Sequence, residues 1–502
     1  MRNIILGTLM ILVVANLSQA LPRRNYMSMR QQILEYEEQM MLGSNLVLNK
    51  VEQEANKVLM NSKKKEMEAA FKNPAMFHPA KNFISAREDI DRSEVFKFLR
   101  RMPKGAVLHS HDTSIVTTDF IYHNITYRDN LYVCDKDGDL RLYFFDKPDQ
   151  TCDWKLLSEV RQDSNRAEEV NKRIIEKMSM VCDNPNDVYT DVNKAWQKFG
   201  NIFTFVDPIL TYRPVYEDHF LKGLEELYED NVLYLELRST LPTLYDFDGT
   251  EYTHKDVVGI YQNLSERFKE EHPDFIGVKL IYAPVRTVDH HQATEYMKTL
   301  KELQTLYPNF IAGFDLVGQE DKGHTLEYFV DIIQEADPDT NFFFHAGETK
   351  WYGMSTDENL VDAILLNTRR IGHGYALSNH PFLLDMVRRM DIAIEVNPIS
   401  NQVLKLTDDM RNHPARRLFA EGYPVVISND DPGFWGSRAL SYDFYEAFMA
   451  IMSERADLKI LKQLAMNSLS YSSMSDPEKM KAFAIWQRKW DDFMKSVANE
   501  EC

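Results

Sequence analysis

Short apolar runs alternate with longer amphipathic stretches along most of the chain. The runs are rich in β-branched and aliphatic residues, whereas apolar positions in the stretches between them have helical spacing. This alternation is typical of repeated strand and helix units. We expect strands at Ala106–His109, Val232–Leu237, Val278–Tyr282, Phe310–Asp315, Phe342–His345, Arg370–Gly372, Ile392–Glu395 and Val425–Ser428.

Eight such runs, each but the last followed by a plausible helix, predict an α/β protein with a (β/α)8 barrel of the TIM type. An open, doubly wound parallel sheet is the alternative. Polar residues that can do chemistry end nearly every predicted strand, and barrel active sites are built at that end. This placement favours the barrel.

An N-terminal extension does not follow the repeat. We expect residues 21–100 to be a helical extension, because apolar residues recur there at helical intervals. The resulting stripe packs either on the rest of the chain or on a second subunit, and the pattern does not distinguish the two. Its clearest members are Val51, Ala55, Val58 and Leu59.

A second irregular segment covers about residues 125–183. It loses clear periodicity, is rich in Asp, Tyr and Lys, and holds three of the four cysteines. We interpret it as an insertion after the first strand of a barrel domain that spans residues 101–502. Cys134 and Cys152 bracket a short stretch and are the preferred disulfide pair. Separate buried thiols are the alternative, because spacing alone does not fix connectivity.

Residues 1–20 are typical of a secretory signal peptide. Arg2 precedes an apolar run from Ile4 to Val14, and small residues up to Ala20 suit a cleavage site. No later window holds the ~20 uninterrupted apolar residues of a membrane span. We therefore expect a secreted, extracellular protein without a membrane span, in which the sequons at Asn124 and Asn263 are glycosylation sites.

Acidic residues outnumber basic ones, with 77 Asp and Glu against 58 Lys and Arg and a formal net charge of −19. Proteins that bind nucleic acid neutralise phosphates with Lys and Arg. The acidic balance therefore argues against a nucleic-acid partner.

Two histidines end the first predicted strand. Alternate side chains of an extended segment project to the same side, so His109 and His111 can bind one ion together. A pair of this kind, taken alone, is more often structural or incidental. A third histidine, His345, ends another predicted strand, and the turn at Gly347 brings the carboxylate of Glu348 over the same end.

The last predicted strand ends in two adjacent acids, Asp430 and Asp431. Like charges this close require a cation or hydrogen bonds. Three histidines and Asp430 form a ligand set that suits zinc, and zinc lowers the pKa of bound water toward ~7. His373, between two glycines at a strand end, is expected to orient and stabilise the resulting hydroxide. The alternatives are a core histidine at 373, a turn acid at 431 and a surface carboxylate at 348.

These segments together resemble the adenosine deaminase family, over about residues 102–475. The signal, the helical extension and the cysteine-bearing insertion resemble its secreted branch, the adenosine deaminase-related growth factors. The matching motifs are His-Ser-His (109–111), Gly-Phe-Asp-Leu-Val-Gly (313–318), His-Ala-Gly-Glu (345–348), Arg-Ile-Gly-His-Gly (370–374) and Asp-Asp-Pro (430–432).

The resemblance implies hydrolytic deamination of adenosine, and of 2′-deoxyadenosine, with release of ammonia and with inosine as the product from adenosine. One zinc ion per subunit is held by His109, His111, His345 and Asp430. Glu348 protonates a purine ring nitrogen while zinc-bound hydroxide attacks the neighbouring carbon.

It also implies which residues contact the substrate. Asp431 hydrogen-bonds the imidazole side of the purine, and the backbone of Gly318 contacts its pyrimidine side. Asp112 and the Trp196–Phe203 segment help to hold the ribose. The secreted branch often has a histidine where this chain has Val285. The family further implies a homodimer formed through the helical extension and a Cys134–Cys152 disulfide that staples the insertion.

Three other functions compete with this one. Adenosine monophosphate deaminases share the metal scaffold, although a secretory signal argues against a cytosolic nucleotide pool. The fold could serve as a scaffold for a growth-factor-like ligand of a cell-surface receptor, but every metal ligand and Glu348 are present. Growth-factor-like activity that arose from adenosine depletion would instead be a consequence of deamination and would not compete with it. A zinc amidohydrolase acting on cyclic amides often has two metals and a modified lysine, and no strand-end lysine of that kind is evident.

Overall fold

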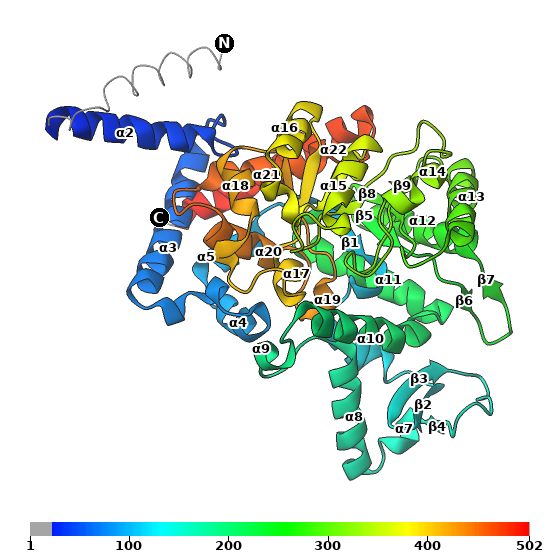
Figure 1. Cartoon of the computed structure of the whole chain (residues 1–502). Helices are drawn as coiled ribbons and strands as arrows, with labels where there is room; N and C mark the ends of the chain where they lie inside the picture. The colour runs from blue at the N-terminus through cyan, green and yellow to red at the C-terminus, as the bar shows by residue number, and fades with distance from the viewer. Residues whose placement is uncertain (1–22, 501–502) are drawn as a thin grey trace.

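The computed structural model describes residues 23–500, so the predicted signal peptide lies outside the described residues. Eight parallel strands form the centre of the molecule, and helices surround them (Figure 1). The strands are β1 (Gly105–His111), β5 (Val232–Ser239), β8 (Gly277–Tyr282), β9 (Ile311–Phe314), β10 (His345–Ala346), β11 (Arg370–His373), β12 (Ala393–Val396) and β13 (Val425–Ile427).

The strands close on themselves. Two four-stranded ladders, β1-β5-β8-β9 and β10-β11-β12-β13, are joined at one seam by a bridge between Phe314 and Phe342 and at the other by a bridge between Ser110 and Asp430. The predicted barrel is thereby confirmed, and an open sheet is excluded. The strand expected at Phe342–His345 pairs regularly only at His345–Ala346, while Phe342 is held by its single bridge to Phe314.

Long helices connect most strands and pack on the outside of the barrel. Thr253 begins one of them, α12, with a reciprocal capping box to Asp256. The larger connecting helices are α11 (Arg213–Glu229), α12 (His254–Glu271), α13 (His290–Leu306), α15 (Ser355–Leu365), α16 (Pro381–Met390) and α21 (Leu458–Ser470). Short helices complete the connections: α14 (Val330–Ile333), α17 (Pro398–Val403), α18 (Ala415–Ala420), α19 (Pro432–Trp435) and α20 (Ser441–Glu446).

The N-terminal segment is helical, as expected, and its second described helix packs on its own chain. Helix α3 (Lys50–Lys72) buries Ala55 and Leu59 and lies against the C-terminal helix α22 (Asp476–Asn499). Glu52 of α3 accepts hydrogen bonds from Trp490 Nε1 at 2.8 Å and Lys462 Nζ at 2.6 Å. The apolar stripe on α3 is therefore largely covered in cis. Helices α4 (Phe83–Ile90) and α5 (Glu94–Arg101) lead into β1.

Helix α2 (Arg23–Met40) is different, because it extends away from the body of the chain (Figure 1). Several of its large apolar side chains face solvent, among them Tyr26, Ile33 and Tyr36, which are 53%, 48% and 40% exposed. An ion pair between Glu38 and Arg455 attaches its C-terminal end. This helix therefore presents an apolar face that the described chain does not cover.

The insertion is a small ordered unit at one side of the barrel (Figure 1). Its antiparallel sheet has the order β3-β2-β4, and Cys134 of β2 forms a disulfide with Cys152 before β4, which confirms the predicted pair. Cys182 is a free, half-buried thiol. The elements of this unit and of the chain that returns to α11 are α6 (Thr118–Phe120), β2 (Leu131–Lys136), β3 (Asp139–Phe144), β4 (Lys155–Leu156), α7 (Leu157–Val160), α8 (Ser164–Met178), α9 (Pro185–Val188) and α10 (Val192–Leu210).

Both sequon asparagines, Asn124 and Asn263, are exposed. Their glycosylation stays a prediction. Among residues 23–500, no helix combines the length and the apolar character needed to cross a membrane.

Candidate active site

The chemically capable residues of the sequence gather at the C-terminal ends of the barrel strands. His109 and His111 lie on β1, His345 on β10 and His373 at the end of β11, while Asp430 follows β13. Nε2 of His109 and Nε2 of His111 lie 3.2 and 3.0 Å from the same oxygen, Oδ1 of Asp430. Segments about 320 residues apart in sequence therefore meet at one point.

Asp430 is aimed at the histidines by its backbone. Its N–H donates to His109 O at 3.1 Å, and its carbonyl accepts from His111 N at 3.0 Å, so the barrel closes at this residue. Asp430 and His373 adopt left-handed φ angles of 58° and 61°. Such angles are uncommon outside glycine and concentrate at functional sites, which agrees with the position of both residues.

A buried carboxylate holds the second ring nitrogen of two of these histidines. Nδ1 of His109 lies 2.7 Å from Glu395 Oε2, and Nδ1 of His345 lies 2.6 Å from Asp315 Oδ2. A carboxylate at Nδ1 keeps the ring proton there and leaves a lone pair on Nε2, which faces the site. Neither acid was among the predicted site residues, although Asp315 lies in the Gly-Phe-Asp-Leu-Val-Gly motif at 313–318.

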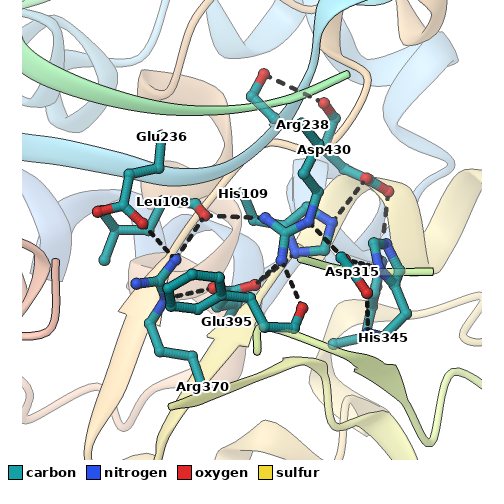
Figure 2. Close-up of polar contacts among 12 residues, drawn as sticks. Leu108, His109, Glu236, Arg238, Asp315, His345, Arg370, Glu395 and Asp430 are labelled. Atoms are coloured by element: carbon teal, nitrogen blue, oxygen red, sulfur yellow. Dashed lines mark hydrogen bonds and ion pairs between the residues drawn. The ribbon is translucent and has the colours of Figure 1, made fainter. Parts of the chain in front are cut away.

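Two buried arginines neutralise these acids (Figure 2). Arg238 pairs with Asp315 and with Glu395, each at 2.8 Å, and Arg370 pairs with Glu395 at 2.5 Å. Burial raises the pKa of Glu395, but Arg238 and Arg370 outweigh it and hold that pKa well below its usual range. The carboxylates therefore stay ionised as acceptors for the histidine rings.

The donor set fits a metal ion. Ligand atoms of His109, His345, His373 and Asp430 lie within 4.8 Å of one another, and His111, Asp430 and Asp431 form a second such group. Although Nε2 of His109 lies 3.2 Å from Asp430 Oδ1, it is buried and forms no hydrogen bond with the described residues, as expected of an atom that ligates an ion. Burial lowers the pKa of His345 to about 4, so its ring is neutral and able to ligate at physiological pH. Imidazole and carboxylate ligands of this kind suit zinc.

Glu348 lies beside this centre, on the turn that follows β10. Its N–H donates to Glu320 Oε2 at 2.6 Å, and the N–H of Gly347 donates to Glu320 Oε1 at 3.0 Å. Oε1 of Glu348 is buried without a hydrogen-bond partner among the described residues and lies 3.6 Å from His373 Nδ1. Burial, together with the charge of Asp430, raises the pKa of Glu348 well above its ordinary value, which favours the protonated carboxylic acid.

Asp431 is the second acid of the pair after β13. Its Oδ1 accepts a hydrogen bond of 2.5 Å from Ser114 Oγ. Burial and the neighbouring Asp430 raise the pKa of Asp431 well above its ordinary value. The two adjacent acids therefore have different surroundings: Asp430 faces the histidines, and Asp431 is hydrogen-bonded to Ser114 and lines the pocket.

A cavity of about 360 Å³ opens onto these residues. This volume is in the range of small-molecule sites, and aromatic side chains from α10 form one wall. The cavity brings together all the residues expected to contact a substrate, with Val285 beside them, 40% exposed. These residues are Asp112, Trp196, Phe203, Gly318 and Asp431.

The carboxylate of Asp112 is heavily used within the protein. Its Oδ2 accepts from Ser239 Oγ at 2.5 Å, Tyr261 OH at 2.8 Å and Tyr216 OH at 3.2 Å, and its Oδ1 accepts from Thr113 N at 2.9 Å. Asp112 thus anchors this wall of the cavity, which leaves little acceptor capacity for a ribose hydroxyl. Its predicted ribose contact stays a prediction.

Two deaminase family models and several curated relatives match this chain. The family model for adenosine deaminase matches residues 172–484, and the model for the adenosine/AMP deaminase N-terminal region matches residues 6–99. The chain is 46% identical to an adenosine deaminase of Phlebotomus duboscqi over 97% of this chain and 96% of that one. It is 42% identical to human adenosine deaminase 2 over 94% of each chain.

Among solved structures, an N6-mAMP deaminase from Arabidopsis superposes with a TM-score of 0.56, covering 78% of this chain and 99% of that one at 17% identity. Identity this low supports the fold alone. The sequence relatives and the family model over residues 172–484 carry the assignment: the chain belongs to the adenosine deaminase family.

Proposed function

We propose that this chain catalyses the hydrolytic deamination of adenosine and 2′-deoxyadenosine, releasing ammonia and forming inosine from adenosine. The observation that carries the proposal is the meeting of a metal-ligating cluster and a buried acid, Glu348, in one cavity. This pairing suits replacement of an amino group on a purine ring by water, because one cavity supplies both the attacking oxygen and the proton donor. The relatives named adenosine deaminase support this choice of substrate.

We assign zinc to the metal position, held by His109, His111, His345 and Asp430. Glu395 and Asp315 orient two of the imidazoles, so that their Nε2 lone pairs face the ion. When bound, zinc supplies a water of lowered pKa and therefore a nucleophile near neutral pH.

Glu348 acts as the acid of the reaction. Because its raised pKa favours the protonated form, Glu348 can donate a proton to the purine ring nitrogen beside the amino-bearing carbon, which makes that carbon more electrophilic. His373 faces Asp430 and the same space, where its ring can orient the attacking oxygen. As the tetrahedral carbon collapses, the C–N bond breaks, the amino group takes up the proton of the added hydroxyl and leaves as ammonia, and the carbonyl of the product forms.

The remaining contacts set specificity. We place the purine against Asp431 and the backbone of Gly318. Gly318 has no side chain, and no atom of the described chain beyond its two neighbours lies within 4 Å of the position that a Cβ would take, so this edge of the cavity is open. Trp196 and Phe203 on α10 lie on the side where the sugar would sit. Val285 offers no hydrogen bond there, so contacts from this position to the ribose are apolar.

We further propose that the protein is secreted and dimeric. The uncovered apolar face of α2 supports a dimer formed through the N-terminal helices. The exposed sequons at Asn124 and Asn263 and the Cys134–Cys152 disulfide suit an extracellular route. Growth-factor-like activity would follow from adenosine depletion.

Ammonia release from adenosine, 2′-deoxyadenosine, AMP and adenine, measured before and after chelation, tests the proposal. We expect release from the two nucleosides that is lost on chelation and restored by Zn²⁺. Preference for AMP would assign the chain to nucleotide deamination instead. If none of the four compounds gives chelator-sensitive release, the proposed activity is wrong.

A further inference from the structure

A chain of buried hydrogen bonds ends on His373. Nδ2 of Asn401 lies 3.1 Å from His373 Nδ1, and Oδ1 of Asn401 lies 2.9 Å from His413 Nε2. The main-chain N–H of Ala415 donates to His413 Nδ1 at 3.1 Å. All three side chains are at most 3% exposed, so solvent does not compete for these hydrogen bonds.

The direction of this chain is fixed by Ala415, because a backbone N–H can only donate. Nδ1 of His413 therefore accepts, and the proton of the neutral ring must lie on Nε2. Burial lowers the pKa of His413 to about 3, which agrees with a neutral ring. Its Nε2–H donates to Oδ1 of Asn401, so the other end of the amide, Nδ2, donates to His373.

The ring proton of His373 is consequently on the opposite nitrogen from the ring protons of His109 and His345. His109 and His345 have a carboxylate at Nδ1, which places the proton there and leaves Nε2 with a lone pair. His373 has an amide N–H at Nδ1, which places the proton on Nε2, 3.8 Å from Oδ2 of Asp430. A protonated ring nitrogen cannot ligate a metal, but it can donate a hydrogen bond to an oxygen.

We propose that Asn401 and His413 are positioning residues: they keep the proton of His373 on Nε2, which makes this ring a hydrogen-bond donor to the attacking oxygen and excludes it from the metal ligands. This inference rests on the proposed deaminase activity. It also resolves the choice among the imidazoles at the centre, because it leaves His111 as the third histidine ligand beside His109 and His345.

We call the hydrogen bonds from Ala415 through His413 and Asn401 to His373 the relay. Asn401→Asp reverses the hydrogen bond to His373 with little change of side-chain volume. A carboxylate accepts from both neighbours, so the proton of His373 moves to Nδ1 and its Nε2 becomes a lone pair. We expect kcat for adenosine to fall about 100-fold or more, as when one preorganised donor is lost, while KM changes little. In the Co²⁺-loaded protein, the visible absorption spectrum should change, because a further imidazole can now ligate the ion.

A pair of substitutions at His413 tests the same relay without introducing a charge. His413→Gln can accept from the Ala415 N–H through Oε1 and donate to Asn401 through Nε2, so it keeps the direction of both hydrogen bonds. We expect its kcat to fall less than about tenfold, a change that corresponds to the free energy of about one hydrogen bond. His413→Leu breaks the relay and should lower kcat well beyond His413→Gln at equal zinc content per chain.

The proposal is overturned if Asn401→Asp retains kcat, or if it loses kcat with an unchanged Co²⁺ spectrum, which would indicate a merely structural role. If Asn401→Asp does not fold, the His413 pair decides, and equal kcat in His413→Gln and His413→Leu contradicts the relay. A wild-type protein that releases no ammonia from adenosine refutes the proposed function instead. The Co²⁺ spectra of the wild type and the variants then still test the proton on His373.

Discussion

Nδ1 of His109 and Oε2 of Glu395 lie 2.7 Å apart, and both side chains are fully buried. The same carboxylate is held by Arg238 and Arg370, so the histidine ring is fixed by a charge network that reaches across the barrel (Figure 2). The network keeps Glu395 ionised without solvent, which preserves its ability to orient His109.

Glu395→Gln should therefore weaken metal binding. The amide removes the negative charge that both arginines share, and loss of an outer partner of this kind costs about 10- to 100-fold in metal affinity. The Kd for Zn²⁺, measured by competition with a chelator, checks this. The matched control is Glu168→Gln on α8, an exposed acid, which should leave the Kd unchanged. An unchanged Kd in Glu395→Gln would show that Glu395 does not support the site.

Glu348→Gln separates the acid from the metal. The amide cannot supply a proton, so we expect kcat to fall by about 10²- to 10⁴-fold. Zinc content per chain should stay as in the wild type, because none of the four proposed ligands changes. Steady-state ammonia release and metal analysis measure the two quantities. Glu358→Gln, at an exposed position on α15, is the control. Wild-type turnover in Glu348→Gln would exclude Glu348 as the proton donor.

Gly347→Ala should disturb both stability and turnover. Gly347 has a φ of 74°, and an added Cβ would lie 2.9 Å from the side chain of Leu360. Gly138, in the hairpin of the insertion, has a φ of 83° but no atom within 4 Å of an added Cβ. Gly138→Ala should therefore cost only the left-handed backbone, about 1 to 2 kcal/mol in the free energy of unfolding.

Gly347→Ala should cost more than that in urea unfolding, because it adds a steric clash to the same backbone strain. It should also lower kcat, since the turn carries Glu348. Equal losses of stability in the two variants would mean that Leu360 moves aside without cost. In that case kcat alone would report on the position of the turn.

The sequence predicted the parts of the site whose signals are local. His109 and His111 share a strand face, and the motifs around His345, His373 and Asp430 each end a recognisable apolar run. The role of Glu395 has no local signal, because its partner His109 is 286 residues away and only barrel closure brings the two together.

Two further features were missed for different reasons. Asn401 acts through His373, 28 residues away, and nothing in its own segment indicates that contact. The hairpin of the insertion did have a signal, because Asp137 and Gly138 adopt φ angles of 57° and 83° between β2 and β3, as two-residue Asp-Gly turns do. The Tyr- and Lys-rich composition of this segment obscured its strands.

Lys63 on α3 provides a pH-dependent test of how the N-terminal extension attaches to the barrel. Its amino group is buried, donates to Ser453 O at 3.0 Å and Ala456 O at 2.9 Å, and lies 3.7 Å from the centre of the Phe448 ring. Burial lowers the pKa of Lys63 to about 7, although Glu454 and Asp457 oppose the shift. The folded protein therefore holds this side chain neutral over much of the alkaline range.

The sign of the effect follows from proton binding. Between the folded pKa of about 7 and the ordinary lysine value of 10.5, the unfolded chain binds the proton and the folded chain does not. The contribution of Lys63 to stability should therefore rise with pH, by up to about 1.4 kcal/mol per pH unit. Urea unfolding of the wild type and of Lys63→Met at several pH values across this window measures it, since other titrating groups cancel in the difference. Lys64→Met, at an exposed neighbouring position, should give a difference that does not change with pH. A difference for Lys63→Met that is flat or falls with pH would show that the amino group stays charged in the folded protein.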